Sequence, residues 1–181
     1  MNPRHIIEKY YPRESPAYCI LIEHSERVAD KAVRIAERLR GFHPDTDFVR
    51  DAAMLHDIGI LFTNEPRIAC FGDKPYICHG YLGRELLERE GLWAHALVCE
   101  RHVGVGISAE EIEAKNLPLP MRDMVPVSIE EKIICYADKF FSKDGHFLSR
   151  EKPLERVRQE IMRYGPDKVE RFDGWARLFG R

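Results

Sequence analysis

Hydrophobic residues recur at steps of three and four along most of the chain, which is the period of an amphipathic helix. Between residues 24 and 39, the positions on one face are His24, Val28, Ala32, Ile35 and Leu39. Gly41 follows and is expected to end this helix. No segment alternates convincingly as a strand does, and there is no internal repeat or low-complexity tract. The pattern therefore predicts an all-α protein.

The same period predicts helices in most of the remaining chain. They cover about 47–57, from about 79 to before 91, roughly 92–102, 128–141, 153–164 and 167–179. Ser128-Ile-Glu-Glu and Ser108-Ala-Glu-Glu resemble capping boxes, so the second of them predicts a short helix over 108–115. The stretches 61–78 and 103–127 contain several glycines and prolines and are expected to be irregular.

Composition narrows the class of protein. The chain has 181 residues, 44% hydrophobic and 32% charged, which predicts one soluble globular domain over 1–181. A net charge of -2 gives no general attraction to nucleic acid or to an anionic membrane. The first residues do not begin a signal peptide, and no apolar run approaches the roughly 20 residues of a membrane span. Five cysteines without a C-x-x-C pair indicate reduced thiols, so we expect a cytoplasmic protein.

Four histidines and two aspartates occupy inward, hydrophobic faces of the expected helices. They are His24, His56, Asp57, His79, His102 and Asp138. A lone histidine on such a face is a core residue roughly three times as often as it is a ligand. Six such residues need a joint explanation, because buried carboxylates are rarely tolerated unpaired. A divalent transition metal explains them together, since imidazole and carboxylate suit Fe, Mn, Ni, Co and Zn.

The positions of two of these residues support a cation site. His56 and Asp57 fall in the last turn before Gly59, where the partial negative charge of a helix end favours a cation. We expect Gly59 to turn the chain sharply and leave the ligands open. Gly83 would permit a close backbone approach or a simple contact between helices. The other histidines are set aside as terminal, loop or surface residues: His5, His43, His95 and His146.

In this order, the six residues resemble the tetrad of the HD-domain superfamily of metal-dependent phosphohydrolases, with two extra histidines. His56-Asp-Ile-Gly is similar to the HDIG subgroup, His24-Ser-Glu-Arg-Val-Ala to the first motif, and Tyr136-Ala-Asp-Lys139 to the last. The resemblance covers residues 20 to 145 and implies an HD-type helical bundle, with the helices of 153–179 packed on it. His102-Val-Gly-Val-Gly-Ile is similar to a stand-alone branch of predicted HD hydrolases.

The resemblance implies two metal ions. His24, His56, Asp57 and Asp138 would hold the first, and Asp57 would bridge to a second, held by His79 and His102. Ile60 stands where many HDIG sequences have lysine, and where related nucleotidases have glutamate. Neither the lysine nor the glutamate can therefore be assigned here as a phosphate ligand or proton donor. Lys139 is a candidate catalytic residue that contacts phosphate, with a solvated lysine as the equal alternative.

The implied function is a phosphomonoesterase or phosphodiesterase that attacks a nucleotide-like phosphoester with a metal-activated water. Symmetrical diadenosine tetraphosphate hydrolase and cyclic-dinucleotide phosphodiesterase are alternatives, and a non-catalytic metal-bound nucleotide sensor is one of another class. A structural metal site ranks last, because no cysteine is in the ligand set. The terminal helices could also form a homodimer contact. Candidate phosphate contacts, each also readable as a surface charge, are Arg27, Lys74, Arg84, Arg101 and Arg122.

Overall fold

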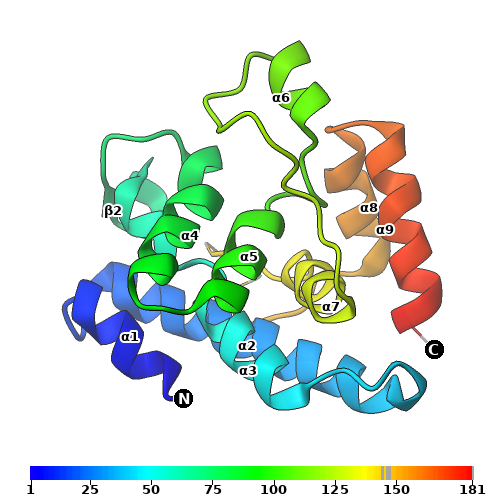
Figure 1. Ribbon diagram of the computed structural model, residues 1–181, viewed down its shortest axis with the longest axis horizontal. Helices are drawn as coiled ribbons and strands as arrows, with labels where there is room; N and C mark the ends of the chain where they lie inside the picture. Colours follow the sequence, from blue (N-terminus) through cyan, green and yellow to red (C-terminus); the bar gives the residue numbers. More distant parts are fainter. Residues whose placement is uncertain (144, 146–147, 181) are drawn as a thin grey trace.

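The computed structural model of the protein describes residues 1–143, 145 and 148–180, and these residues are mainly helical (Figure 1). The helices are α1 (Pro3–Tyr10), α2 (Pro16–Arg38), α3 (Thr46–Leu55), α4 (His79–Arg89), α5 (Trp93–Arg101), α6 (Ala109–Ala114), α7 (Ile129–Asp138), α8 (Leu154–Met162) and α9 (Pro166–Phe179). The all-α prediction is confirmed. No helix in this part of the chain is both long enough and apolar enough to cross a membrane.

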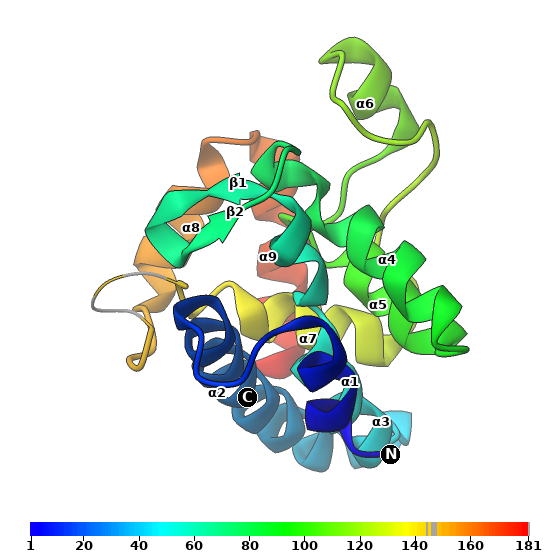
Figure 2. The same ribbon diagram turned by 90° about the vertical axis from the view of Figure 1, so that its left-hand side faces the viewer.

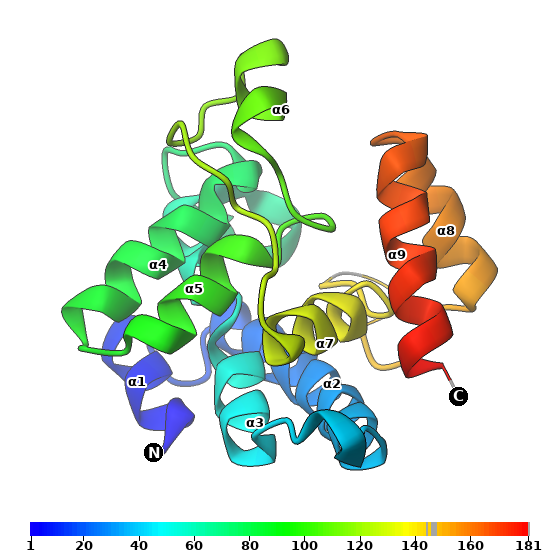
Figure 3. The ribbon, with the colours of Figure 1, turned by 45° about the vertical axis from the view of Figure 1, so that its right-hand side comes forward.

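The helices pack around α2, the longest of them. Helices α3 and α7 lie against α2, and α4 pairs with α5 above them (Figure 1). Helices α8 and α9 form a separate pair beyond α7, which Figure 3 shows side by side. The ring of Tyr136 on α7 stacks on Phe172 of α9, with ring centroids 5.0 Å apart. One cluster of buried hydrophobic side chains extends from Ile7 in α1 to Phe179 in α9.

Several helix ends differ from the sequence prediction. Helix α2 begins at Pro16 rather than near residue 24, because the Ser15 side chain accepts a hydrogen bond from the Tyr18 amide and proline suits the first turn. Helix α7 ends at Asp138 and not at Phe141. The side chains of Ser108 and Ser128 each accept a hydrogen bond from the backbone amide three residues later, as expected of helix caps. Helix α1 buries only Ile7, too few inward positions to show the helical period.

The two stretches expected to be irregular contain short elements. The first holds 3-10 turns at Ile58–Phe62, Pro66–Ile68 and Tyr76–Cys78, and a two-stranded antiparallel ladder of β1 (Asn64–Glu65) and β2 (Cys70–Phe71), visible in Figure 2. Strands of two residues are too short to show alternation in the sequence. The second stretch carries α6, which stands away from the other helices in Figures 1 and 2 and has its own small cluster of Ile107, Ile112 and Met124.

The prediction that Gly59 turns the chain is wrong. Helix α3 already ends at Leu55, and Gly59 lies inside the 3-10 turn Ile58–Phe62 without a positive φ. A Cβ on Gly59 would lie 2.1 Å from the His79 carbonyl oxygen and 2.4 Å from the Gly83 amide nitrogen. A Cβ on Gly83 would lie 2.2 Å from the Cys99 sulfur on α5 and 3.1 Å from the Gly59 amide nitrogen. Gly83 therefore lies both at a contact between helices and at a close backbone approach, the two alternatives expected there. Both glycines are therefore needed where the 3-10 turn, α4 and α5 meet.

Gly59→Ala should destabilise the protein. The added methyl group must displace backbone atoms of α4, so the free energy of unfolding should fall by about 1–3 kcal/mol or more. Urea unfolding measures the change. Gly41→Ala is the matched control, because nothing lies within 4 Å of a Cβ there and its φ is not positive. It should change stability by less than about 0.5 kcal/mol. Equal stability of the two variants would contradict this account of Gly59.

Candidate metal centre

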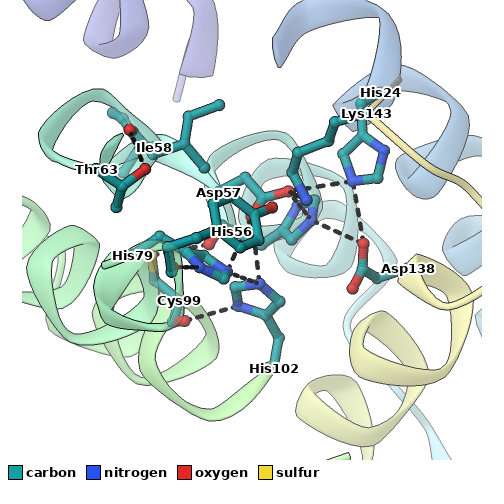
Figure 4. A network of polar contacts seen from close by, with 12 residues as sticks. His24, His56, Asp57, Ile58, Thr63, His79, Cys99, His102, Asp138 and Lys143 are labelled. Carbon is teal, nitrogen blue, oxygen red and sulfur yellow. Dashed lines mark hydrogen bonds and ion pairs between the residues drawn. The ribbon is translucent and has the colours of Figure 1, made fainter. Parts of the chain in front are cut away.

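The six inward polar residues come together at one place in the core (Figure 4). His24 lies inside α2, whereas the other five lie at helix ends. His56 and Asp57 follow α3, His79 begins α4, His102 follows α5, and Asp138 ends α7. All six are buried, and His24, His56 and Asp57 have no exposed surface. The prediction that these six residues point inward is confirmed, although His56, Asp57 and His102 lie just beyond the helices that were expected to contain them.

The first group of candidate ligands contains His24, His56, Asp57 and Asp138, with one ligand atom from each within 4.8 Å of the others. Nε2 of His24 lies 3.0 Å from Oδ1 of Asp138 and 3.1 Å from Oδ2 of Asp57. Nε2 of His56 lies 2.9 Å from the same Asp57 oxygen and 3.4 Å from Oδ1 of Asp138. These distances leave two imidazole nitrogens and two carboxylate oxygens facing one point.

The second group uses the other oxygen of Asp57. Nε2 of His79 and Nε2 of His102 lie 3.4 Å and 3.3 Å from Oδ1 of Asp57, and 3.1 Å from each other. Asp57 is thus shared, with Oδ2 in the first group and Oδ1 in the second. This is the arrangement that the resemblance implied for a bridging carboxylate.

Backbone carbonyls orient three of the four imidazoles. Nδ1 of His56, His79 and His102 lies 2.6, 2.6 and 2.7 Å from the carbonyl oxygen of the residue three positions earlier. A carbonyl only accepts, so each Nδ1 carries a proton, and in the neutral imidazole Nε2 then keeps a free lone pair. Partners of this kind fix the tautomer and the ring orientation of metal-binding histidines. Two buried thiols, Cys99 and Cys135, donate in turn to the carbonyls of His56 and His102.

Burial and neighbouring charges shift the pKa values of these groups in different directions. Burial acts to raise the pKa of Asp57, yet His56 and Lys143 hold it well below its usual range. Burial and the neighbouring His102 outweigh the attraction of Asp57 and lower the pKa of His79 to about 3. Burial acts to lower the pKa of His56, but Asp57 and Asp138 outweigh it and raise that pKa to about 9. Asp57 is therefore ionised and His79 neutral at neutral pH.

Some buried polar atoms of the cluster have no hydrogen-bond partner among the described residues. Nε2 of His56 and Oδ1 of Asp57 are buried and make no hydrogen bond within the described residues. Such orphaned atoms are costly unless something else binds them. A divalent cation accepts both imidazole nitrogen and carboxylate oxygen, so these residues could hold a metal ion in each group.

Two lysines border the cluster. Nζ of Lys139 lies 2.6 Å from Oδ2 of Asp138 and donates to the His102 carbonyl oxygen at 3.1 Å. Its ammonium thus orients two candidate ligands. This role differs from both roles predicted for Lys139, a phosphate contact and a solvated lysine. Nζ of Lys143 lies 2.6 Å from Oδ2 of Asp57. Lys143 follows the end of α7, where no helical period marks it, and it was missed from the sequence.

A cavity of about 580 Å³ borders the cluster and is lined by His79, His102 and Asp138. The five basic residues expected to contact phosphate do not line this cavity. Arg84 and Arg122 both pair with the buried carboxylate of Glu100, and Arg101 pairs with Glu131. Lys74 is exposed beside Asp73, and Arg27 is exposed on α2. The basic side chains that do line the cavity are Arg67, Lys115, Lys139, Lys143, Lys152, Arg163 and Lys168.

Three of the four histidines set aside lie apart from the cluster. His5 and His43 are exposed. His95 packs edge-on against Phe48, with ring centroids 4.9 Å apart. His146 lies outside the described residues.

The model of the HD domain family matches residues 21–142, a segment that contains all six clustered residues. The chain belongs to the HD-domain family. It is 36% identical over 145 residues to the tRNA (cytidine(56)-2'-O)-methyltransferase of Picrophilus torridus, and 37% identical over 150 residues to the enzyme of that name from Thermoplasma volcanium. These matches cover 75% and 82% of this chain but 38% and 39% of those proteins.

A third relative is the protein MJ0778 of Methanocaldococcus jannaschii, 36% identical over 121 residues. That match covers 65% of this chain and 64% of the relative. The chain thus spans about two fifths of the two methyltransferases and less than two thirds of MJ0778. No solved structure matches this HD-domain protein.

Single substitutions should separate the two groups of ligands. His79→Ala or His102→Ala should lower the metal content from about two ions per chain toward about one, because only the second group loses a ligand. His24→Ala should empty the first group, and Asp57→Ala should empty both. Elemental analysis of protein purified without chelator gives the count.

The exposed His5→Ala is the control for removing an imidazole, and it should leave the metal content unchanged. Full metal content in both His79→Ala and His102→Ala would show that these histidines do not hold a second ion.

Proposed function

We propose that this HD-domain protein is a metal-dependent phosphohydrolase, a phosphomonoesterase or phosphodiesterase with a nucleotide-like phosphoester as substrate. The observation that carries the proposal is the position of Asp57, whose two oxygens belong to two different groups of candidate ligands. Because members of both groups line the cavity, a substrate in the cavity can reach both.

Two divalent transition ions are the proposed cofactors, held by the two groups of ligands that share Asp57. The donor set suits Fe, Mn, Ni, Co or Zn. When bound, such ions supply a water of lowered pKa and neutralise charge on a phosphoryl group. Hydrolysis adds that water across the phosphorus–oxygen ester bond, and the leaving oxygen takes a proton.

The chain itself provides a site for the rest of the substrate. The cavity volume lies within the range of small-molecule sites. Tyr76, Phe141 and Tyr164 supply aromatic surface that a nucleobase can stack on, and the basic side chains supply countercharge for phosphate. These features support a phosphorylated small molecule with a planar group.

The accessibility of the candidate ligands weighs against a structural metal site. A structural zinc site is usually closed and rich in cysteine. Here His79, His102 and Asp138 border a cavity, and all six candidate ligands are histidine or aspartate. A non-catalytic nucleotide sensor would use the same cavity, so turnover distinguishes it from an enzyme.

A phosphate within or beside tRNA is a second candidate substrate. It is favoured by the two relatives named as tRNA methyltransferases, and it runs against our expectation from net charge that nucleic acid is not a partner. The named activity belongs to whole proteins of which this chain covers 38% and 39%. We therefore do not transfer methyl transfer itself to this chain.

A substrate screen with protein of known metal content tests the proposal. The substrates are p-nitrophenyl phosphate, its bis ester, nucleoside mono-, di- and triphosphates, diadenosine tetraphosphate, cyclic dinucleotides and tRNA. We expect Mn- or Fe-dependent hydrolysis of at least one of them. Asp57→Ala should reduce it by more than about 100-fold, because losing a ligand costs more than losing an outer partner of the metal.

The outcome also separates the alternatives. Tight nucleotide binding by fully metal-loaded protein without any turnover would favour the sensor. A protein that keeps its metal but neither binds nor hydrolyses any of these compounds would contradict the proposed function.

A further inference from the structure

Lys143 is a cationic side chain placed among the candidate metal ligands. It lies beyond the end of α7, and Figure 4 shows it reaching into the cluster. Its side chain is 12% exposed, and Nζ lies 2.6 Å from Oδ2 of Asp57. The ammonium also lies 5.8 Å from the centroid of the Tyr76 ring. Because Lys143 lines the cavity, it touches both the ligand cluster and the space open to substrate.

The ammonium uses the oxygen that a metal ion in the first group would need. Nε2 of His24 and of His56 approach the same Oδ2 of Asp57, at 3.1 and 2.9 Å. A divalent cation and an ammonium cannot both contact this oxygen closely, since like charges a few ångströms apart repel strongly in a buried site. Lys143 must therefore give up this contact when the ion binds. The cavity offers its long side chain room to move.

Lys139 does not have this freedom. Its ammonium is held by the Asp138 carboxylate and by the carbonyl oxygen of His102. The carbonyl contact remains when Asp138 binds a cation. Lys139 is thus a positioning residue for the ligands, whereas the position of Lys143 depends on the state of Asp57.

We propose that Lys143 binds the oxygens of the phosphoryl group that faces the metal centre, leaving Asp57 when divalent ions load. The inference rests on the proposed function and assigns a substrate contact to it. Once displaced, the ammonium has no anionic partner, and a phosphoryl group supplies one. Lysine offers three hydrogen-bond donors to the phosphoryl oxygens. Charge-assisted hydrogen bonds of this type are among the stronger ones in proteins.

Binding of inorganic phosphate to the Mn-loaded protein tests this contact without requiring turnover. Lys143→Met should weaken phosphate binding by about 10- to 100-fold, the cost of losing a hydrogen bond to a charged group. Its metal content should be at least that of the wild type, because the lysine is not a ligand and competes with the ion. Lys143→Arg should restore part of the phosphate affinity. Titration calorimetry and elemental analysis on the same samples give both values.

Two further variants serve as controls. Lys139→Met should lower the metal content, because Asp138 loses the ammonium that orients it. Lys143→Met, in contrast, should lower the phosphate affinity without loss of metal. Lys9→Met removes an exposed positive charge on α1, outside the cavity, and should change neither value. If a substrate is found, Lys143→Met should mainly raise KM or lower kcat/KM at full metal content, and Lys143→Arg should be intermediate.

The outcomes separate this inference from the hydrolase proposal. Wild-type protein that binds no phosphate when loaded, or Lys143→Met that binds phosphate as tightly as the wild type, overturns the role of Lys143. Loss of metal in Lys143→Met also overturns it, because the lysine would then support the cluster. Phosphate affinity that depends on Lys143 in a protein without turnover would uphold the contact and reject the hydrolase. An active enzyme whose phosphate affinity and kinetics are unaffected by Lys143→Met would uphold the hydrolase and reject the contact.

Discussion

The carboxylate of Asp57 has no exposed surface, and keeping it ionised there is the constraint on which the rest of the structure depends. An isolated buried carboxylate costs several kcal/mol, so its surroundings must supply positive charge or donors. Two helices, α2 and α4, and the loop after α7 direct His24, His79 and Lys143 at its oxygens. A second buried carboxylate, Asp138, is held in the same way by His24 and Lys139. The helices are therefore packed so that their polar ends converge.

Close packing makes this convergence possible. Gly59 and Gly83 let the 3-10 turn after α3 approach α4 to a distance that no side chain would allow. The thiol of Cys99 fills the adjoining space on α5 and donates to the carbonyl of His56. The imidazoles of His56 and His102 then bond to carbonyls in the last turns of α3 and α5, where a helix leaves carbonyls without partners. The imidazole of His79 bonds to the Tyr76 carbonyl in the 3-10 turn before α4. The orientation of these three imidazoles is thus built into the backbone.

The side of the cavity away from the cluster is built from other parts of the chain. Lys168 and Arg171 of α9 donate to carbonyls in the loop before α6, at Gly106 and Val105. Lys168 also pairs with Glu111 of α6. These contacts join the C-terminal helix to the irregular stretch 103–127, so that both line the same space. The candidate ligands lie within the matched HD segment, whereas α8 and α9 lie outside it.

The sequence by itself determined the helical class and the burial of the six clustered residues, because the helical period marks the positions that face inward within or directly beside a helix. The sequence also predicted the family, because the motifs that indicate it are short segments of neighbouring residues. Only the tertiary structure decided the contact of Lys143 with Asp57 and the pairing of Arg84 and Arg122 with Glu100. Those contacts join segments far apart in the chain, and periodicity carries no information about which helix ends meet. The packing role of Gly59 was not readable from the sequence either, because the atoms that exclude a side chain there belong to α4.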